Sequence, residues 1–314
     1  MDVFIYDEHG AQFQLPALFS WRVTHGCGEA CDAIDCSFAY HPSQDTVLPR
    51  AVKVTAFVRG QQVFCGQPDE WTVSQGVRGR TVSLWGRGRQ ALLMDDEAEP
   101  AHFARASWQD ILARYVTPKG IAAESGVLPA AVDFHVESGM SLWQVVTAFA
   151  RDHAGRYPRF SLDGQLLIRA FETGTQQELD LTLRGVSAVC SLNRHGVIAR
   201  TLVRNRDTLQ SYLLKNDAFP GPGGRRQVVT GVGREGVAQM ERSARRSMRR
   251  SLCGYMTVNV TLPWPFAARP GETLSLTEAP EGFAGAYVVW EAESSCDGQN
   301  GAATKLMLVP PGYL

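Results

Sequence analysis

The feature that most constrains this chain is the succession of short, β-branched segments in its first 95 or so residues. Arg59-Gly60-Gln61 predicts a turn between two of them, Gly66 is expected to end the second, and Gly76 and Gly79 separate the later ones. The strands expected here are Ala51–Val58, Gln62–Cys65, Trp71–Ser74 and Thr81–Trp85. Short strands at close spacing indicate an antiparallel barrel or sandwich.

The rest of the composition sets the broad class. The chain has 314 residues, which suits two or three domains. Apolar residues make up 44% and charged residues 20%, which argues against a disordered or fibrous protein. The net charge is −1, so no overall field favours nucleic acid or an acidic membrane surface.

The chain shows no targeting or membrane-spanning signal. Met1–Glu8 lacks the basic start and apolar run of a signal peptide, and no segment approaches the roughly 18 apolar residues of a membrane span. Seven scattered cysteines do not resemble a secreted disulfide framework. We therefore expect a chain that is made and kept in a cytosol.

The middle of the chain changes character after the acidic boundary Asp95–Pro100. Ser107 and Ser141 each begin a capping-box pattern, and the apolar residues that follow predict two short helices, the second ending near Gly155. Arg159–Ile168 predicts a hairpin that turns on Asp163-Gly164 with positive φ at both positions. These segments predict a small α+β unit.

Strands return from about residue 179, interrupted by one helix from about Glu235 to Leu252. The expected strands are Leu179–Leu183, Gly196–Val203, Arg226–Thr230, Tyr255–Leu262, Glu272–Leu276, Ala286–Trp290 and Thr304–Val309. The order is thus β, then α+β, then β, and the protein is expected to be mainly β.

Gly231–Gly236 fits the G-x-G-x-x-G pattern of dinucleotide sites, between a predicted strand and a predicted helix. No βαβ pattern surrounds it, and the region roughly 20 residues further on lacks the acidic residue that would hold a ribose. A helix-entry loop is the favoured interpretation, and we assign no cofactor.

The helix after this loop has an apolar stripe and an opposite basic side. The stripe comprises Val237, Met240, Ala244, Met248 and Leu252. The arginine face, as we call it, comprises Arg242, Arg245, Arg246, Arg249 and Arg250. Interleaved aromatic residues are missing, which disfavours nucleic acid. The alternatives are a solvated face or one that pairs with carboxylates of a neighbouring subunit, and the arginine face is our candidate subunit interface.

A group of cysteines and histidines near the N-terminus raises the question of a metal. It comprises His25, Cys27, Cys31, Cys36 and His41. Its spacings differ from the usual Cys-x2-Cys pair of zinc sites, so we assign no metal ligand, and Cys36 is expected to be a small buried hydrophobe.

Motifs of catalysis are missing too. No nucleophile elbow, H-E-x-x-H or Walker loop occurs, and the seven histidines form no triad order. Asp95, Asp96 and Glu97 could imitate a catalytic carboxylate pair, but they lie in a boundary segment without an apolar pocket. We therefore expect a structural assembly part and no enzyme.

Four ordered stretches resemble the baseplate hub proteins of phage tails and contractile injection systems, the late-control-protein-D-like family. They are the strand-turn-strand Val54–Gly66, the strand and exit Val82–Asp95, the helix and hairpin Ser141–Ile168, and the closing run Ala268–Leu276, Gly285–Trp290 and Thr304–Leu308. Together they span most of the chain.

The resemblance implies two antiparallel, tube-like β-barrel domains, at 1–97 and 179–314, around a small α+β domain at 98–178. It further implies a homotrimeric ring that joins the hexameric tail tube to the central spike, because two barrels per chain reconcile sixfold with threefold symmetry. Tail tube, spike, and baseplate wedge or tape-measure proteins would be partners, in a virion or tail-like particle assembled in the host cytoplasm. No cofactor, membrane or sequence-specific nucleic acid is implied.

Two other functions stay open at this point. A carbohydrate- or cell-wall-binding module would suit the β-rich ends and the seven tryptophans, which could stack on sugars. A nucleotide-binding enzyme would rest on Gly231–Gly236 alone.

Overall fold

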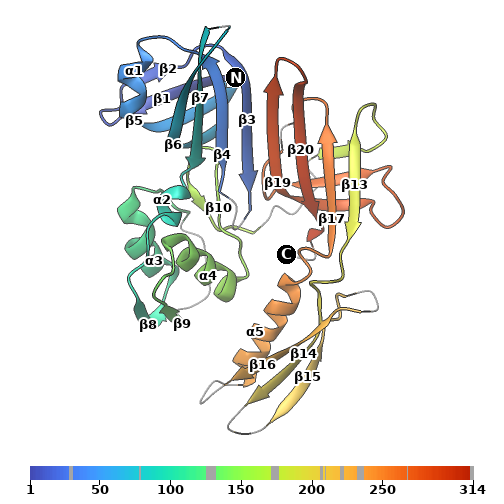
Figure 1. Cartoon of the computed structure of the whole chain (residues 1–314). Coiled ribbons are helices and arrows are strands. Elements are labelled where there is room, and N and C mark those ends of the chain that lie inside the picture. Colours follow the sequence, from blue (N-terminus) through green and yellow to red (C-terminus); the bar gives the residue numbers. More distant parts are fainter. Residues whose placement is uncertain are drawn as a thin grey trace. The chain divides into compact units, whose positions relative to one another are not determined.

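The computed structural model describes residues 1–27, 31–77, 79–124, 132–170, 177–205, 208, 210–219, 223–231, 237–266 and 268–311 (Figure 1). The chain divides into two compact units. Unit 1 comprises Met1–Ala170, Leu262–Pro270 and Glu291–Lys305, and unit 2 comprises Phe171–Thr261, Gly271–Trp290 and Leu306–Leu314. Strands predominate in both, which confirms the prediction of a mainly β protein. No helix in the described ranges is long and apolar enough to span a membrane.

The first sheet of unit 1 is antiparallel throughout. Its strands are β1 (Asp2–Asp7), β2 (Gln12–Gln14), β3 (Leu18–Gly26), β4 (Ala33–Ala39), β5 (Ala51–Val58), β6 (Gln61–Gly76) and β7 (Gly79–Gly88). They lie in the order β3-β4-β7-β6-β5-β1-β2, and the second half of β19 (Gly285–Asp297) pairs with β3 at the edge. Helix α1 (Gln44–Val47) and the 3₁₀ turn η1 (Leu48–Arg50) connect β4 to β5.

The core of this sheet is formed by every second side chain along its strands. Along β4, Ile34, Cys36 and Phe38 are buried, and the residues between them are more exposed. Cys36 is therefore a small buried hydrophobe, as predicted. Together with Val54 of β5 and Leu84 of β7, these side chains belong to one apolar cluster.

The prediction that Gly66 ends a strand is wrong, because β6 runs through it to Gly76. A Cβ atom at Gly66 would collide with the carbonyl oxygen of Arg87 on β7, so glycine permits the close approach of the two backbones. Pro68 follows at a bulge, where the register shifts and a missing N–H is tolerated. The expected turn at Arg59-Gly60 is present.

The remainder of unit 1 has a second apolar core built on helices. Its elements are α2 (Ala91–Met94), β8 (Ala101–Ala106), α3 (Trp108–Ile111), the π-helical turn η2 (Leu112–Val116), the 3₁₀ turn η3 (Thr117–Lys119), β9 (Val132–Val136), α4 (Leu142–Ala154), β10 (Arg159–Phe160) and β11 (Leu166–Leu167). Val145, Val146 and Phe149 of α4 are at most 1% exposed at its centre. The pairing of β8 with β9 was not predicted.

Both predicted capping boxes are confirmed. Ser107 caps α3 with Asp110, and Ser141 caps α4 with Gln144. Gly155 ends α4 in the left-handed conformation, as expected.

The predicted hairpin is confirmed by the pairing of β10 with β11, but its turn differs. Gly164 has φ of 84°, whereas Asp163 has no positive φ. The N–H of Gly164 donates to the carbonyl of Ser161, and that of Ser161 donates to the carbonyl of Gln165. This is a type I turn followed by a left-handed glycine, so only one position needs glycine's freedom.

Unit 2 contains two sheets. Its strands are β12 (Gln177–Asp180), β13 (Ser187–Leu192), β14 (Ile198–Asn205), β15 (Ser211–Lys215), β16 (Arg225–Gly231), β17 (Met256–Leu262), β18 (Thr273–Thr277), the first half of β19, and the end of β20 (Gly301–Val309). One sheet has the order β13-β17-β20-β19, with β18 beside β19 and β12 beside β18. Strand β12 ends at Asp180, three residues before the predicted end.

The second sheet of unit 2 has the order β15-β14-β16 and carries helix α5 (Val237–Arg250). Strand β16 is parallel to β14, and β12 is parallel to β18, so the second β segment is not antiparallel throughout as predicted. Closure of either segment into a barrel, and the three-domain division, stay predictions.

Candidate functional site

The arginine face lies on α5. It turns away from the three-stranded sheet because the predicted apolar stripe on the other side of the helix packs against that sheet. Met240, Ala244 and Met248 are at most 3% exposed and pack on Ile198, Val203 and Leu214 of the three-stranded sheet. Leu252, after the helix, is buried as well. The side chain of Val237 lies outside the described residues.

The opposite side of α5 turns its charges outward. Arg245 is 56% exposed and pairs with Glu241 one turn earlier, at 2.8 Å between Nη2 and Oε1. Arg249 and Arg250 are exposed, and Arg246 is half-buried. A solvent-screened pair of this kind contributes about 0.3–0.5 kcal/mol, so the Arg245–Glu241 pair adds little to folding. Its role as a subunit interface stays a prediction, and the side chain of Arg242 lies outside the described residues.

Most of the glycine motif lies outside the described residues. Gly231 ends β16, and residues 232–236, which make up the predicted helix-entry loop, lie outside the described residues.

The two histidines of the N-terminal group contact nearby polar side chains, and two of its cysteines are protonated by burial. The Nδ1 atom of His25 lies 3.3 Å from Asp32, and that of His41 lies 2.9 Å from Ser43. Burial raises the pKa of the Cys27 and Cys31 thiols to about 12, so neither is a ready thiolate.

Within the described ranges, the one group of three metal-ligating side chains close enough to share an ion is His102, Asp133 and His135. Sequence reasoning missed it, although Asp133-x-His135 places two ligands on one face of a strand.

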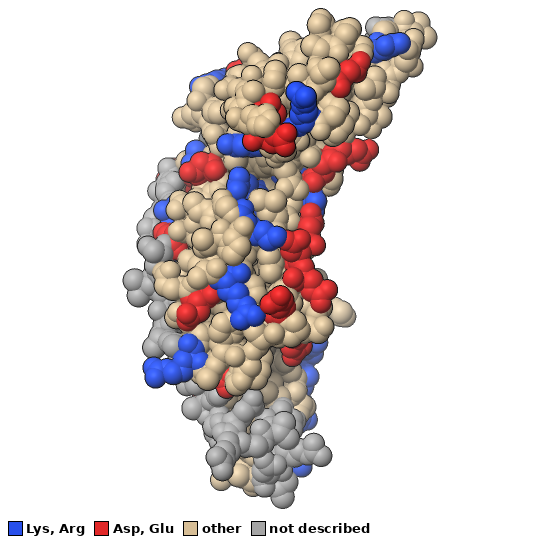
Figure 2. Space-filling view, turned by 90° about the vertical axis from the view of Figure 1, so that its left-hand side faces the viewer, with Lys and Arg blue, Asp and Glu red and all other residues tan. Residues whose placement is uncertain are grey.

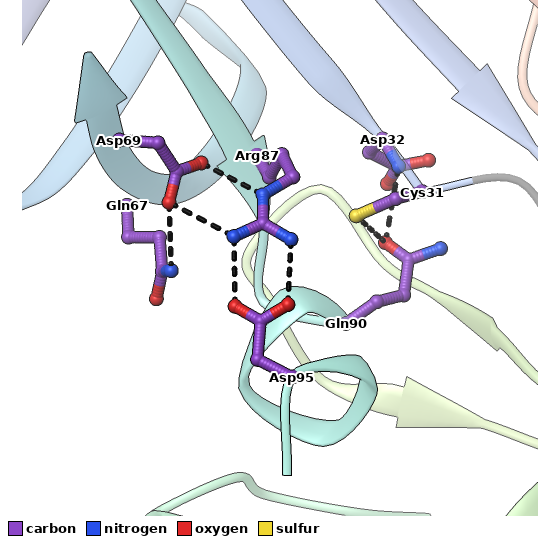
Figure 3. Close-up of polar contacts among 7 residues, drawn as sticks. All are labelled: Cys31, Asp32, Gln67, Asp69, Arg87, Gln90 and Asp95. Carbon is purple, nitrogen blue, oxygen red and sulfur yellow. Dashed lines mark hydrogen bonds and ion pairs between the residues drawn. The ribbon is translucent and has the colours of Figure 1, made fainter. Parts of the chain in front are cut away.

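A closed ion-pair cluster joins the first sheet to the helical core of unit 1. Arg87, at the end of β7, makes paired hydrogen bonds of 2.9 and 3.1 Å to Asp69 and of 2.8 and 2.7 Å to Asp95 (Figure 3). These bonds raise the pKa of Arg87, and they lower the pKa of the Asp95 carboxyl. Because the guanidinium faces a carboxylate on both sides, it acts as a clamp between β6 and α2.

The three boundary carboxylates that could imitate a catalytic pair are each occupied. Asp95 binds Arg87, Asp96 pairs with Lys119, and Glu97 accepts the N–H of Gly139 at 2.9 Å. Asp95 thus links the sheet to the helices, whereas Asp96 and Glu97 make their contacts within the helical part of unit 1.

A second polar group beside the clamp holds the β3–β4 connection. Gln90 is fully buried, and its Oε1 accepts the N–H of Asp32 at 3.2 Å (Figure 3). Asp32 in turn accepts the N–H of Gly88 on its carbonyl, and that of Gly26 on its carboxylate. Charge-assisted and buried hydrogen bonds of this kind fix how β3, β4 and β7 meet.

A cavity of about 380 Å³ lies in unit 1. Trp21, Val23 and His25 of β3 line it together with Phe266 and Arg59. Arg59 has φ of 52°, an uncommon conformation for a residue other than glycine, and with Gly60 it forms a type I′ turn between β5 and β6. None of the described lining residues is an aspartate or a glutamate, so these walls offer no carboxylate for acid–base chemistry.

The hairpin of β6 and β7 presents apolar side chains to solvent. Trp71 is 38% exposed, Val73 46% and Trp85 41%. Strand β5 pairs with β6 only as far as Gly66, so in the described part of unit 1 the outer half of β6 has one strand neighbour, β7. An open edge with apolar side chains is a typical template for another chain. Sequence reasoning missed this surface, which we call the β6 edge.

The face of the molecule drawn in Figure 2 carries charges of both signs. Figure 2 shows acidic and basic side chains interspersed on the face in view, without one continuous basic patch. This agrees with the net charge of −1.

Comparison with solved structures identifies the fold. A tail protein from Neisseria meningitidis MC58 is 14% identical, with a TM-score of 0.80 over 99% of this chain and 97% of that one. The fold is that of phage tail proteins. The 43 kDa tail protein of prophage MuSo2 from Shewanella oneidensis is also 14% identical, with a TM-score of 0.77 over 100% of this chain and 99% of that one.

A third similar structure belongs to a secretion-system protein. An E. coli component of the type VI secretion system, described as similar to the T4 tail proteins gp27 and gp5, is 12% identical. Its TM-score is 0.61 over 93% of this chain and 73% of that one. No protein-family profile matches the sequence, and no curated protein does.

Proposed function

We propose that this chain is a structural hub subunit of a phage tail or phage-tail-like particle, in which three copies form a ring that joins the hexameric tail tube to the central spike. The observation that carries the proposal is the match along nearly the full length of two tail proteins, at TM-scores of 0.80 and 0.77. The four ordered sequence stretches support it independently, because they depend on the order of residues alone.

The proposal assigns a part to each segment. Segments 1–97 and 179–314 would form the tube-like wall of the ring, and segment 98–178 would face baseplate wedge or tape-measure proteins. Two wall segments in each of three copies supply the six positions that a hexameric tube requires. The separate apolar core around α4 supports a distinct middle segment, although Leu93 at the end of the first segment also contributes to this core.

Two surfaces are suited to contacts in such a ring. Among the described residues, the outer half of β6 has no strand neighbour on one side and carries exposed apolar side chains, which favours strand addition by a neighbouring subunit. The arginine face offers guanidinium groups for carboxylates of a neighbour. Both surfaces carry exposed side chains that a neighbouring subunit would cover, and assembly accounts for both.

The proposed role is mechanical, with no catalytic step and no cofactor. The clamp at Arg87 would serve this role by holding the sheet and the helical core of unit 1 together. A virion or tail-like particle assembled in the host cytoplasm would be its location.

The test is reconstitution. The purified chain would be combined with candidate tail tube and spike proteins from the same genome, and the mass of the complex would be measured by native mass spectrometry. We expect a complex with three copies of this chain that binds both partners. A chain that joins neither partner at micromolar concentration would refute the proposal.

Variants separate the two surfaces. Val73→Lys and Arg249→Glu should each weaken assembly, and the folded chain should keep its unfolding midpoint because both side chains are exposed. Val189→Lys on β13, which is 62% exposed, is the matched control for charge at an exposed strand position. If all three variants assemble like the unaltered chain, neither surface is a subunit contact.

A further inference from the structure

The β8–β9 pair brings together three side chains that the proposed function does not use. His102 of β8 lies directly opposite His135 of β9, and Asp133 stands two residues before His135 on the same face. All three are exposed, at 54% for His102 and 65% for each of the other two side chains.

Their atoms converge on one point. The Nε2 atoms of His102 and His135 lie 2.7 and 3.5 Å from the Oδ1 atom of Asp133. The imidazole rings stack with centroids 4.1 Å apart and planes 7° apart, so both present the same edge to the carboxylate. The three ligand atoms all lie within 4.8 Å of one another.

We propose that His102, Asp133 and His135 bind one divalent transition-metal ion, of the class of Zn²⁺. Two imidazole nitrogens and a carboxylate oxygen are a donor set that suits Zn²⁺, Cu²⁺ or Ni²⁺. Metal–ligand bonds of about 2.0–2.2 Å in tetrahedral geometry place ligand atoms roughly 3.3–3.5 Å apart. The two stacked rings must turn out of their parallel arrangement for both Nε2 lone pairs to point at one ion.

The opposite face of the pair holds the ligands in place. Phe134, between Asp133 and His135, is buried, and its ring meets that of Phe149 at 5.2 Å and 86°. Phe103, next to His102, packs against Tyr115. Because alternate residues are anchored in the core, the three ligands stand on a fixed backbone, which lowers the entropy lost on binding.

The chemistry leaves a fourth position open. Three protein ligands with one open position is the pattern in which Zn²⁺ keeps a water molecule or accepts a ligand from outside. On an exposed surface, this position is accessible to solvent.

The experiment measures Zn²⁺ binding to the full chain, purified without a histidine tag, by competition with a chromogenic chelator. His135→Gln and Asp133→Asn each remove one ligand at an exposed position. Changes around a metal's direct ligands already cost about 10–100-fold in affinity, so loss of a ligand should cost at least tenfold. His9→Gln is the matched control, because His9 is exposed beside the carboxylate of Glu8, 3.6 Å away.

The seven thiols are common to all four proteins, so any binding to them cancels in the comparison. We expect the unaltered chain and His9→Gln to bind one more equivalent of Zn²⁺ than the two site variants. In the unaltered chain, NMR signals of the His102 and His135 rings should move on Zn²⁺ addition while those of His9 stay. Equal binding by all four proteins, or ring signals that do not respond, would overturn the proposal.

Discussion

Helices α4 and α5 each pack on neighbouring strands, but they use their sequences in opposite ways. Helix α4 is enclosed, with Trp143, Val145, Val146 and Phe149 all buried. Helix α5 buries a narrow stripe and turns its arginines outward. Helices that are mostly apolar stabilise a core, whereas a thin stripe holds a helix in place and leaves its other side for partners.

The arginines of the two regions differ in the same manner. Arg87 is 25% exposed and paired with two carboxylates, while Arg245 is 56% exposed and paired with one. A closed cluster contributes to the fold of unit 1, and an open one is suited to contacts with other molecules.

Among the variants that separate the two helices, we expect the largest loss of folding stability at Phe149. Phe149→Ala should lower the free energy of unfolding by about 3–5 kcal/mol, because it leaves a cavity in a core that cannot collapse. Urea unfolding followed by circular dichroism measures this. Phe19→Ala, at a side chain 54% exposed, should change it by less than about 0.5 kcal/mol. Similar losses in both variants would contradict the enclosed packing of α4.

Met248 tests the thin stripe of α5. Met248→Ala should cost about 2 kcal/mol, at the lower end for such truncations, because few apolar side chains surround it. Hydrogen exchange should show faster exchange of α5 amides with little change in α4, since a helix opens locally when its own packing is weakened. Faster exchange in both helices would show that the two cores unfold together.

The clamp should be sensitive to pH. Arg87→Met should cost about 1–2 kcal/mol at neutral pH, discounted for partial exposure. The folded-state pKa of Asp95 is lowered, so the stability it contributes is present above its ordinary pKa and is lost as pH falls through the lower folded-state value.

Unfolding of the unaltered and variant chains at a series of pH values between 7 and 3 measures this difference, which should shrink toward the acid end. Arg22→Met removes an exposed arginine with a looser pair at 3.9 Å and serves as control. A difference that stays constant down to the acid end would exclude Asp95 as its source.

The cap of α4 should contribute a smaller amount. Ser141→Ala should cost about 1 kcal/mol, because the N–H of Gln144 loses its acceptor. Ser141→Asp retains an acceptor and should be close to neutral. Thermal unfolding of both variants measures the difference. Equal losses would mean that the serine acts through packing.

The smallest effect on folding is expected on the arginine face. Arg249→Ala should change the free energy of unfolding by less than about 0.5 kcal/mol, measured by urea unfolding, because the side chain is exposed. A loss above about 1 kcal/mol would place Arg249 in the fold of unit 2 and remove the contrast with α4.

The helix caps, the stripe of α5 and most strands could be predicted because each depends on residues near in sequence. Gly66 was misjudged because its glycine serves β7, a strand more than ten residues further on. The clamp and the His102 group were missed for the same reason, since Asp69 and Asp95, or His102 and His135, meet only after distant strands pair. The alternation and spacing of residues in a sequence can locate a strand, but they do not say which other strand pairs with it.

The pairing of β3 with the second half of β19 has a consequence for synthesis. Gly26 on β3 meets Glu291 on β19, about 265 residues later in the chain. At roughly 5–20 residues per second, a ribosome needs roughly 13–53 s to make the intervening segment. Until then that edge of the nascent sheet has no strand to cover it, which is the condition in which sheets join the wrong chain. Slow translation or a stalled ribosome would therefore lengthen the time for which this edge stays uncovered.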